Sequence, residues 1–149
     1  MGKPIILFFF IVWVSVFAYA QKANLRVVVD QAISNKGTVK IGVFNSFHHF
    51  MTHTQPVYSS VELIDDSTAS HTFTDIPFGR YAIAVYHDEN NDDTLNTKSL
   101  HIPLEGVGFS GKFPSRIKPP DYPHASFRLK QDTTIIIHLI YAKKKKPRK

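Results

Sequence analysis

Residues 77–86 read PFGRYAIAVY, and this stretch indicates the fold class. Pro77 fixes its own φ and Gly79 is free to take a positive φ, so the first half is typical of a tight turn. From Tyr81 to Val85 large apolar residues alternate with alanine. This alternation matches the period of two that one face of a sheet imposes on a strand. A turn that leads directly into a strand predicts a β-rich domain.

The same period of two recurs along most of the chain, and turn signals such as Asn35-Lys36-Gly37 separate the segments. The β-branched run at residues 133–137 is the strongest of them. Only residues 46–51 could make a helical turn. We expect strands at residues 25–30, 39–44, 60–64, 70–74, 81–86, 125–130 and 133–141. The pattern predicts an all-β fold, namely a single antiparallel Greek-key β-sandwich of about seven strands.

One long segment, residues 88–124, interrupts this pattern. It holds five prolines and three glycines. Loops of this length inside a compact domain are usually functional or disordered. We expect one long ordered loop packed on the sandwich, because the segment also carries apolar residues: Leu100, Ile102, Leu104, Val107, Phe109, Phe113 and Tyr122.

The N-terminal twenty residues have the three parts of a secretory signal. Lys3 supplies a positive charge, residues 5–18 are almost entirely apolar, and Ala18-Tyr19-Ala20 has small residues where a signal peptidase acts. The alternative is a membrane anchor, but the apolar run is shorter than the roughly 20 residues that a spanning helix needs. We therefore expect a signal peptide at 1–20, cleavage after Ala20, a secreted or periplasmic protein that does not span a membrane, and a domain at 21–142.

The net charge of +6 belongs to the ends of the chain. Lys3 leaves with the signal, and residues 143–149 carry six Lys and Arg, so the body is close to neutral. We expect 143–149 to be a disordered basic tail, which is either a solvated end or a means of attachment to anionic surfaces. No second basic patch with interleaved aromatics supports nucleic-acid binding. The chain has no cysteine, which excludes disulfides and thiolate zinc sites.

The long loop opens on an acidic stretch, residues 88–96, which read DENNDDTLN. Alternating oxygen-bearing side chains resemble the opening of calcium loops, where hard oxygen ligands surround the ion. Asp93 stands where that pattern has glycine, and Ser99 where it has glutamate. The alternative is an Asx-rich turn whose side chains bind their own backbone. The calcium hypothesis takes as ligands Asp88, Asn90, Asp92, Thr94, Asn96 and Glu105.

Other motifs give weaker support to a chemical activity. His48, His49 and His53 could bring imidazoles together, but their spacing fits no standard zinc or copper site. Residues 106–111 match Gly-x-Gly-x-x-Gly without the strand and helix that phosphate binding needs. Ser110 lacks the glycine context of a nucleophile elbow. Catalysis is thus the alternative function, a metal-dependent hydrolase that would use the long loop with His87, Asp88 and Glu105.

Three longer motifs carry a family resemblance. They are DIPFGRYAIAVYHDEN at 75–90, IPLEGVGFS at 102–110, and Pro119-Pro120 followed by ASF at 125–127. They resemble the bacterial secreted family catalogued as domain of unknown function 2141, over Leu25 to Tyr141. The resemblance implies an extracytoplasmic β-sandwich similar to transthyretin-like and carboxypeptidase-regulatory-like modules, and it implies no activity. Together these features predict a secreted, non-catalytic binding or structural module of unknown ligand, stabilised by calcium at its acidic loop.

Overall fold

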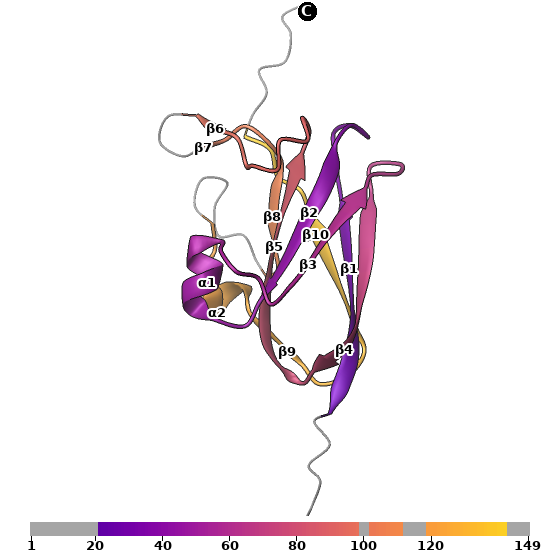
Figure 1. The fold of residues 1–149 in the computed structure, drawn as a ribbon, viewed down its shortest axis with the longest axis vertical. Helices are drawn as coiled ribbons and strands as arrows, with labels where there is room; N and C mark the ends of the chain where they lie inside the picture. The colour runs from indigo at the N-terminus through magenta and orange to yellow at the C-terminus, as the bar shows by residue number, and fades with distance from the viewer. Residues whose placement is uncertain (1–20, 99–101, 112–118, 143–149) are drawn as a thin grey trace, which may run out of the picture.

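The computed structural model describes residues 21–98, 102–111 and 119–142. Two β-sheets face each other across a shared core, and two short helices cover part of the outer side of the larger sheet (Figure 1). The predicted all-β sandwich is confirmed. The predicted signal peptide, 1–20, and the predicted basic tail, 143–149, lie outside the described residues.

The smaller sheet has the strand order β10–β1–β4. Its strands are β1 (Lys22–Asp30), β4 (Ala69–Pro77) and β10 (Thr133–His138). β1 pairs antiparallel with β4 but parallel with β10, which departs from a purely antiparallel sandwich. Parallel neighbours need a long crossover connection. β1 opens the domain and β10 closes it, so the chain that forms the other sheet supplies that crossover.

The larger sheet has the order β3–β2–β5–β8, and β9 also pairs with β5. Its strands are β2 (Thr38–Phe44), β3 (Tyr58–Leu63), β5 (Gly79–Asp88), β8 (Val107–Phe109) and β9 (Phe127–Leu129). β9 pairs with the beginning of β5 and β8 with its later part. β8 was not predicted, because three residues centred on Gly108 are too few to show an alternation.

The main core lies between the two sheets and follows the predicted alternation. Leu25 and Val27 of β1 are fully buried, and so are Val39 and Val43 of β2. Their sequence neighbours are mostly exposed or half-buried. Burial of alternate aliphatic side chains contributes about 1.5–3 kcal/mol for each one removed from water, so the period of two in the sequence determines which faces meet.

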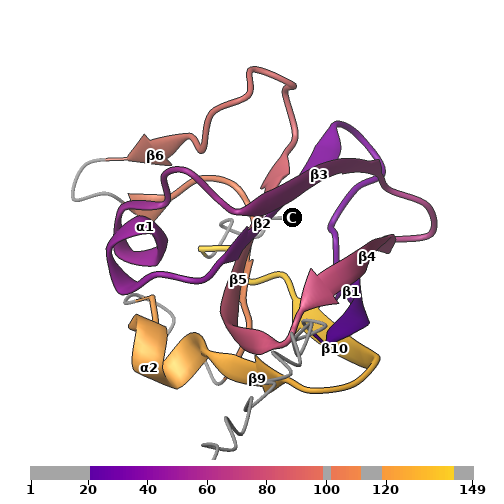
Figure 2. The same cartoon turned by 60° about the horizontal axis from the view of Figure 1, so that its bottom comes forward.

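A second, smaller core lies on the outer face of the larger sheet. The helices α1 (Phe47–Thr52) and α2 (Tyr122–Ala125) lie beside each other there (Figure 2). Ser46 caps α1, because its Oγ accepts a hydrogen bond from the His49 amide at 3.4 Å. The helices bury Phe50 and Ala125 against the strands beneath. The predicted helical turn at 46–51 is confirmed, whereas α2 was not predicted. In the described ranges no helix has the length and apolar character that a membrane crossing requires.

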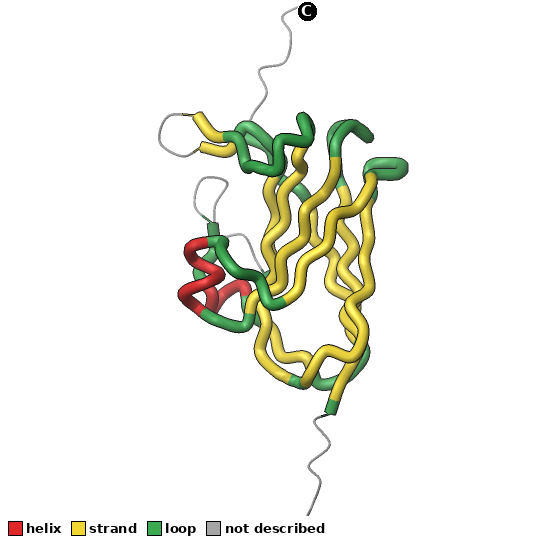
Figure 3. The backbone as a smooth tube through the Cα atoms, viewed as in Figure 1, coloured by secondary structure: helices red, strands yellow, loops and turns green. Residues whose placement is uncertain are grey.

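The segment 88–124 is more structured than one continuous loop. Its described part holds β6 (Thr97–Lys98) and β7 (Ile102–Pro103), which pair with each other, as well as β8 and α2. Figure 3 shows the turns next to β6 and β7 at one end of the sandwich and short loops beside the helices. Residues 99–101 and 112–118 lie outside the described part. The acidic stretch therefore occupies one end of the sandwich, between β5 and β6.

Candidate functional site

The acidic loop begins where β5 ends and turns sharply through residues 89–96. Asn91 and Asp93 have φ values of 56° and 62°, in the left-handed region that favours glycine. Aspartate and asparagine enter this region more readily than other residues, because their short side chains form local hydrogen bonds. Asp93 thus takes the conformation of the glycine it replaces in the calcium pattern, and the tight turn forms without glycine.

Asp88 is the buried anchor of this loop. Its side chain is fully buried, and its two oxygens accept hydrogen bonds from the backbone amides of Asp92, at 3.2 Å, and Asp93, at 3.0 Å. Lys40 of β2 places its Nζ 3.7 Å from Asp88 Oδ2 and also pairs with the Asp93 carboxylate. The hydrogen bond with Asp93 raises the pKa of Lys40, with further contributions from the charges of Asp93 and Asp88. Lys40 is thus a cation that already offsets the clustered carboxylates.

Sequence reasoning missed Lys40. It lies almost fifty residues before the acidic loop, and only the pairing of β2 with β5 brings it there. In that register Lys40 is opposite Tyr86, two residues before Asp88 on the same face of β5. The sequence does place Lys40 at an outward position of its strand. It does not show which residues of β5 lie opposite, so the contact with Asp88 could not be predicted.

The exposed half of the loop is a network centred on Asp92. Asp92 Oδ1 accepts hydrogen bonds from the Thr94 amide and hydroxyl at 2.9 and 2.8 Å, and Oδ2 accepts from the side-chain amides of Asn96 and Asn90 at 2.9 and 2.8 Å. These donors, with Asn96 first, lower the pKa of Asp92 well below its usual range. This arrangement matches the Asx-rich turn that the sequence analysis gave as the alternative.

Glu105, in the bend between β7 and β8, closes the loop. Its side chain is buried, Oε1 accepts a hydrogen bond from the Glu89 amide at 3.1 Å, and Oε2 accepts one from the Asn96 amide at 2.8 Å. One carboxylate therefore holds the two ends of the acidic loop together. Glu105 meets the acidic loop, where it accepts hydrogen bonds from backbone amides.

The calcium hypothesis can be tested against this donor set. Most side-chain oxygens of Asp88, Asp92 and Glu105 accept hydrogen bonds from loop amides or hydroxyls. Among the described residues no three His, Cys, Asp or Glu side chains are placed to hold one metal ion. A bound calcium would require the Asn90 and Asn96 amides to turn their oxygens inward. The calcium site stays a prediction.

His87 lies on the opposite face of β5 and points into the sandwich. It is fully buried; its Nε2 is 2.7 Å from the Lys36 carbonyl and its Nδ1 is 2.7 Å from the Tyr141 hydroxyl. A carbonyl only accepts, so Nε2 donates to the Lys36 carbonyl, and Nδ1 forms its hydrogen bond with the Tyr141 hydroxyl. Both ring nitrogens therefore have a hydrogen-bond partner. His87 therefore ties β5 to the C-terminal end of the domain, and it does not share a surface with Asp88.

The other residues considered from the sequence, the histidines near α1 and Ser110, make contacts that support the fold. The imidazole rings of His48 and His49 lie 5.7 Å apart between centroids, while the His53 ring contacts Phe50 and Phe109. Ser110 is buried, accepts from the Ile83 amide at 2.7 Å and donates to the Ala125 carbonyl at 2.8 Å. Ser110 therefore joins β5 to α2.

A groove on the outer face of the larger sheet is the main concave feature beside the acidic loop. It encloses about 410 Å³. Two rows of paired residues form its floor, and the first crosses β3, β2, β5 and β8 as Ser59, Gly42, Ala84 and Phe109. The second row crosses the same strands as Val61, Lys40, Tyr86 and Val107. Small residues in the middle of the first row leave the surface hollow there.

The walls of this groove come from two separate segments. His53, at the end of α1, forms one wall, and partial burial against the aromatic rings lowers the pKa of His53. Asp93 and Leu95 of the acidic loop form the other. The Tyr86 hydroxyl donates to the Asp93 carbonyl at 3.1 Å, which fixes this second wall to the sheet.

Comparison with known proteins gives one family. A family model described as "Uncharacterized protein conserved in bacteria (DUF2141)" matches residues 27–137, most of the domain. Neither the curated proteins nor the solved structures give a match. The match confirms the resemblance carried by residues 75–90 and 102–110, and the chain belongs to the bacterial family of domain of unknown function 2141.

Proposed function

We propose that the protein is a non-catalytic binding module that works outside the cytoplasm and takes a small ligand in the groove on its larger sheet. The observation that carries this proposal is the pair of residue rows across β3, β2, β5 and β8, hollowed at Gly42 and Ala84 and enclosing about 410 Å³. Pockets for small ligands are commonly about 300–1,000 Å³ and mostly apolar, with a few polar groups.

The lining suggests the chemistry of the ligand. Phe109, Val61 and Leu95 offer apolar surface, and Val61 is 57% exposed. Tyr86 and the ion pair of Lys40 with Asp93 place polar groups at one end of the groove. The ligand that fits is a small molecule with a flat or ring-shaped apolar face and hydrogen-bonding groups at one end. Because the lysine and the carboxylate are paired with each other, they suit recognition better than proton transfer.

A groove-filling variant tests this proposal. Ala84 lies in the middle of the floor, so Ala84→Leu is expected to fill the hollow and to remove binding. Ligand-observed NMR with a panel of small aromatic and cyclic alcohols, such as phenol, indole and inositol, measures this. Thr74→Leu makes a similar enlargement at an exposed position of β4 in the other sheet, and it is the matched control. Equal binding to the wild type and both variants, or no binding to any of them, would contradict the proposal.

The proposed location has its own test. The N-terminal signature predicts that the exported protein starts at Gln21. Intact-mass measurement of the protein recovered from the culture medium or periplasm is expected to give a chain that lacks residues 1–20. An intact N-terminus on that protein would refute the cleavage.

A further inference from the structure

A pocket at the end of the domain opposite the acidic loop has a different character. It encloses about 600 Å³ and is bounded by the start of β1, the turn before β5, and β9. Three cationic side chains line it, Arg80, Arg128 and Lys130, and no carboxylate does. It shares no residue with the groove on the larger sheet. Any ligand here is therefore separate from the one proposed above.

The two arginines are direct partners in the β-ladder. β5 and β9 run antiparallel with Arg80 opposite Arg128. Both side chains are exposed, while Leu129, which follows Arg128, is fully buried. Lys130 is two residues after Arg128 and exposed as well, so the alternation places it on the same face. Like charges directly opposite each other destabilise a strand pair.

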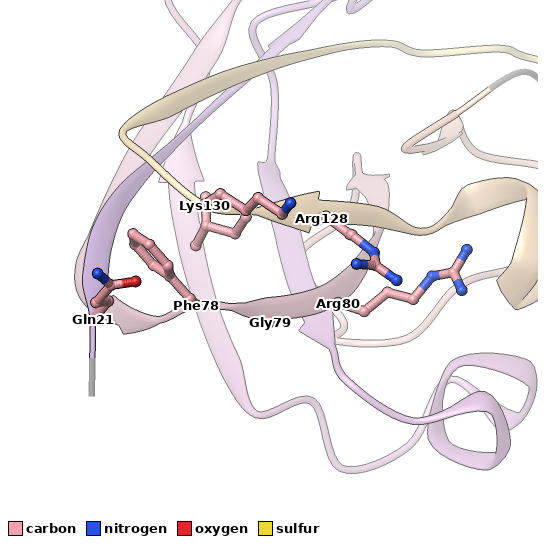
Figure 4. A pocket seen from close by; sticks show the side chains of 7 residues that line it. Gln21, Phe78, Gly79, Arg80, Arg128 and Lys130 are labelled. Atoms are coloured by element: carbon pink, nitrogen blue, oxygen red, sulfur yellow. The ribbon is translucent and has the colours of Figure 1, made fainter. Parts of the chain in front are cut away.

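No ion pair among the described residues offsets these charges. None of the ion pairs there includes Arg80, Arg128 or Lys130. Arg80 donates from Nε to Ser126 Oγ at 2.8 Å, which orients the guanidinium and leaves its terminal nitrogens to other partners. Figure 4 shows the guanidinium groups of Arg80 and Arg128 next to each other at one end of the pocket. Two guanidinium groups so placed can donate several hydrogen bonds to one oxyanion, and this geometry suits carboxylate and phosphate.

The other end of the pocket is apolar in part. Phe78 stands beside Gln21 there, away from the arginines (Figure 4). Gly79 lies between Phe78 and Arg80 in the chain, and it lines the pocket between the ring and the cations. A ligand that spans this pocket therefore needs an anionic group at one end and an apolar body at the other.

We infer that this pocket is a binding site for a small organic anion, with its phosphate or carboxylate group between Arg80 and Arg128 and its apolar body against Phe78. Lys130 adds attraction for the same group. The anion takes the place of the counter-charge that the described residues lack, and its binding relieves the repulsion between the paired arginines.

Isothermal titration calorimetry of the purified protein with three probes tests the inference. The probes are phenyl phosphate, which carries both the anion and the ring, inorganic phosphate, which carries the anion alone, and benzyl alcohol, which carries the ring without a charge. Phenyl phosphate is expected to bind most tightly of the three. Benzoate, titrated in addition as the carboxylate counterpart, is expected to bind more tightly than benzyl alcohol. Binding is expected to weaken as the ionic strength rises from about 0.02 to 0.3 M, since salt screens charges at an exposed site. Inorganic phosphate that binds as tightly as phenyl phosphate would overturn the role of Phe78.

Arg128→Gln is the decisive variant, and Arg26→Gln, at an exposed position of β1, is its control. Hydrogen bonds to charged groups are strong enough that Arg128→Gln should weaken phenyl phosphate binding by about tenfold or more. Equal binding to both variants, or no binding of phenyl phosphate to the wild type, would overturn the site.

Thermal melting keeps this result separate from a folding defect. Arg128→Gln removes one of two opposed like charges, so it is expected to melt at or above the wild-type temperature. Phenyl phosphate should raise the melting temperature of the wild type and leave that of Arg128→Gln unchanged, because only a bound ligand stabilises the native state. A marked drop in the melting temperature of Arg128→Gln without ligand would contradict the absence of an ion pair between Arg128 and the described residues.

Discussion

Lys40→Met is the most informative perturbation of the acidic loop. The substitution keeps the aliphatic stem on the sheet and removes the cation whose Nζ lies 3.7 Å from Asp88 Oδ2. At that separation two unit charges attract by about 4 kcal/mol if the effective dielectric constant is about 20. The Lys40 side chain is 18% exposed, so water screens part of this attraction. The Asp88 carboxylate stays buried and keeps its two amide donors.

These contributions place the cost of Lys40→Met between that of an exposed pair, up to about 1 kcal/mol, and that of a broken buried pair, about 3–5 kcal/mol. We expect a loss of about 2 kcal/mol in the free energy of unfolding. For a domain of this size that corresponds to a fall of roughly 8 °C in the melting temperature. Circular dichroism in the strand region measures it. Lys22→Met, at an exposed position of β1, is the control and should melt within a degree or two of the wild type.

The same variant gives a sharp test of the calcium hypothesis. Without the lysine the carboxylates of the loop have lost their counter-charge, so calcium should raise the melting temperature of Lys40→Met more than that of the wild type. Chelator should reverse the gain, and Asp88→Ala should abolish it. A calcium effect absent from both proteins would end the calcium hypothesis. A melting temperature of Lys40→Met equal to that of Lys22→Met would refute the electrostatic reasoning itself.

Four further predictions follow from other contacts. The pKa of Asp92 is lowered, so its contribution to stability is complete above the unfolded value of about 3.9 and is lost as the pH falls below it. Asp92→Ala should therefore make the free energy of urea unfolding less dependent on pH across that acid range. Ser110→Ala leaves the buried Ile83 amide without its hydroxyl partner and should cost about 1–3 kcal/mol in urea unfolding, against little change for the exposed Ser70→Ala. Gly37→Ala should unfold the chain or lower its melting temperature strongly, because φ is 74° and a Cβ would collide with the Asp88 carbonyl. Deleting residues 143–149 should abolish any salt-sensitive binding to anionic vesicles, because each lost cation contributes about 1 kcal/mol of binding free energy. The melting temperature should not change. Binding that persists after the deletion would contradict the hypothesis that the tail attaches the protein to anionic surfaces.

The sequence predicted the parts of the fold that depend on local pattern. Alternation places Leu25 and Val27 on the core side of β1, and the helical turn expected at 46–51 corresponds to α1, which Ser46 caps. The parallel pairing of β1 with β10 was not predictable in this way, because it depends on where two distant strands meet. β8 was missed for the related reason that its three residues acquire a strand conformation only by pairing with β5.

The candidate sites show the same division between local and long-range information. The acidic loop could be found because its residues are consecutive, and its internal hydrogen bonds also follow from that local sequence. The groove and the cationic pocket could not, since each depends on the register of β5 with its neighbours: Ala84 opposite Gly42 leaves the hollow, and Arg80 opposite Arg128 concentrates the charge. β5 therefore carries both surfaces, one near each end, with Asp88 closing the strand at the acidic loop. A register shift of one residue would move Ala84 and Arg80 to the core face together, so the core packing of Ile83 and Val85 is what keeps both surfaces facing outward.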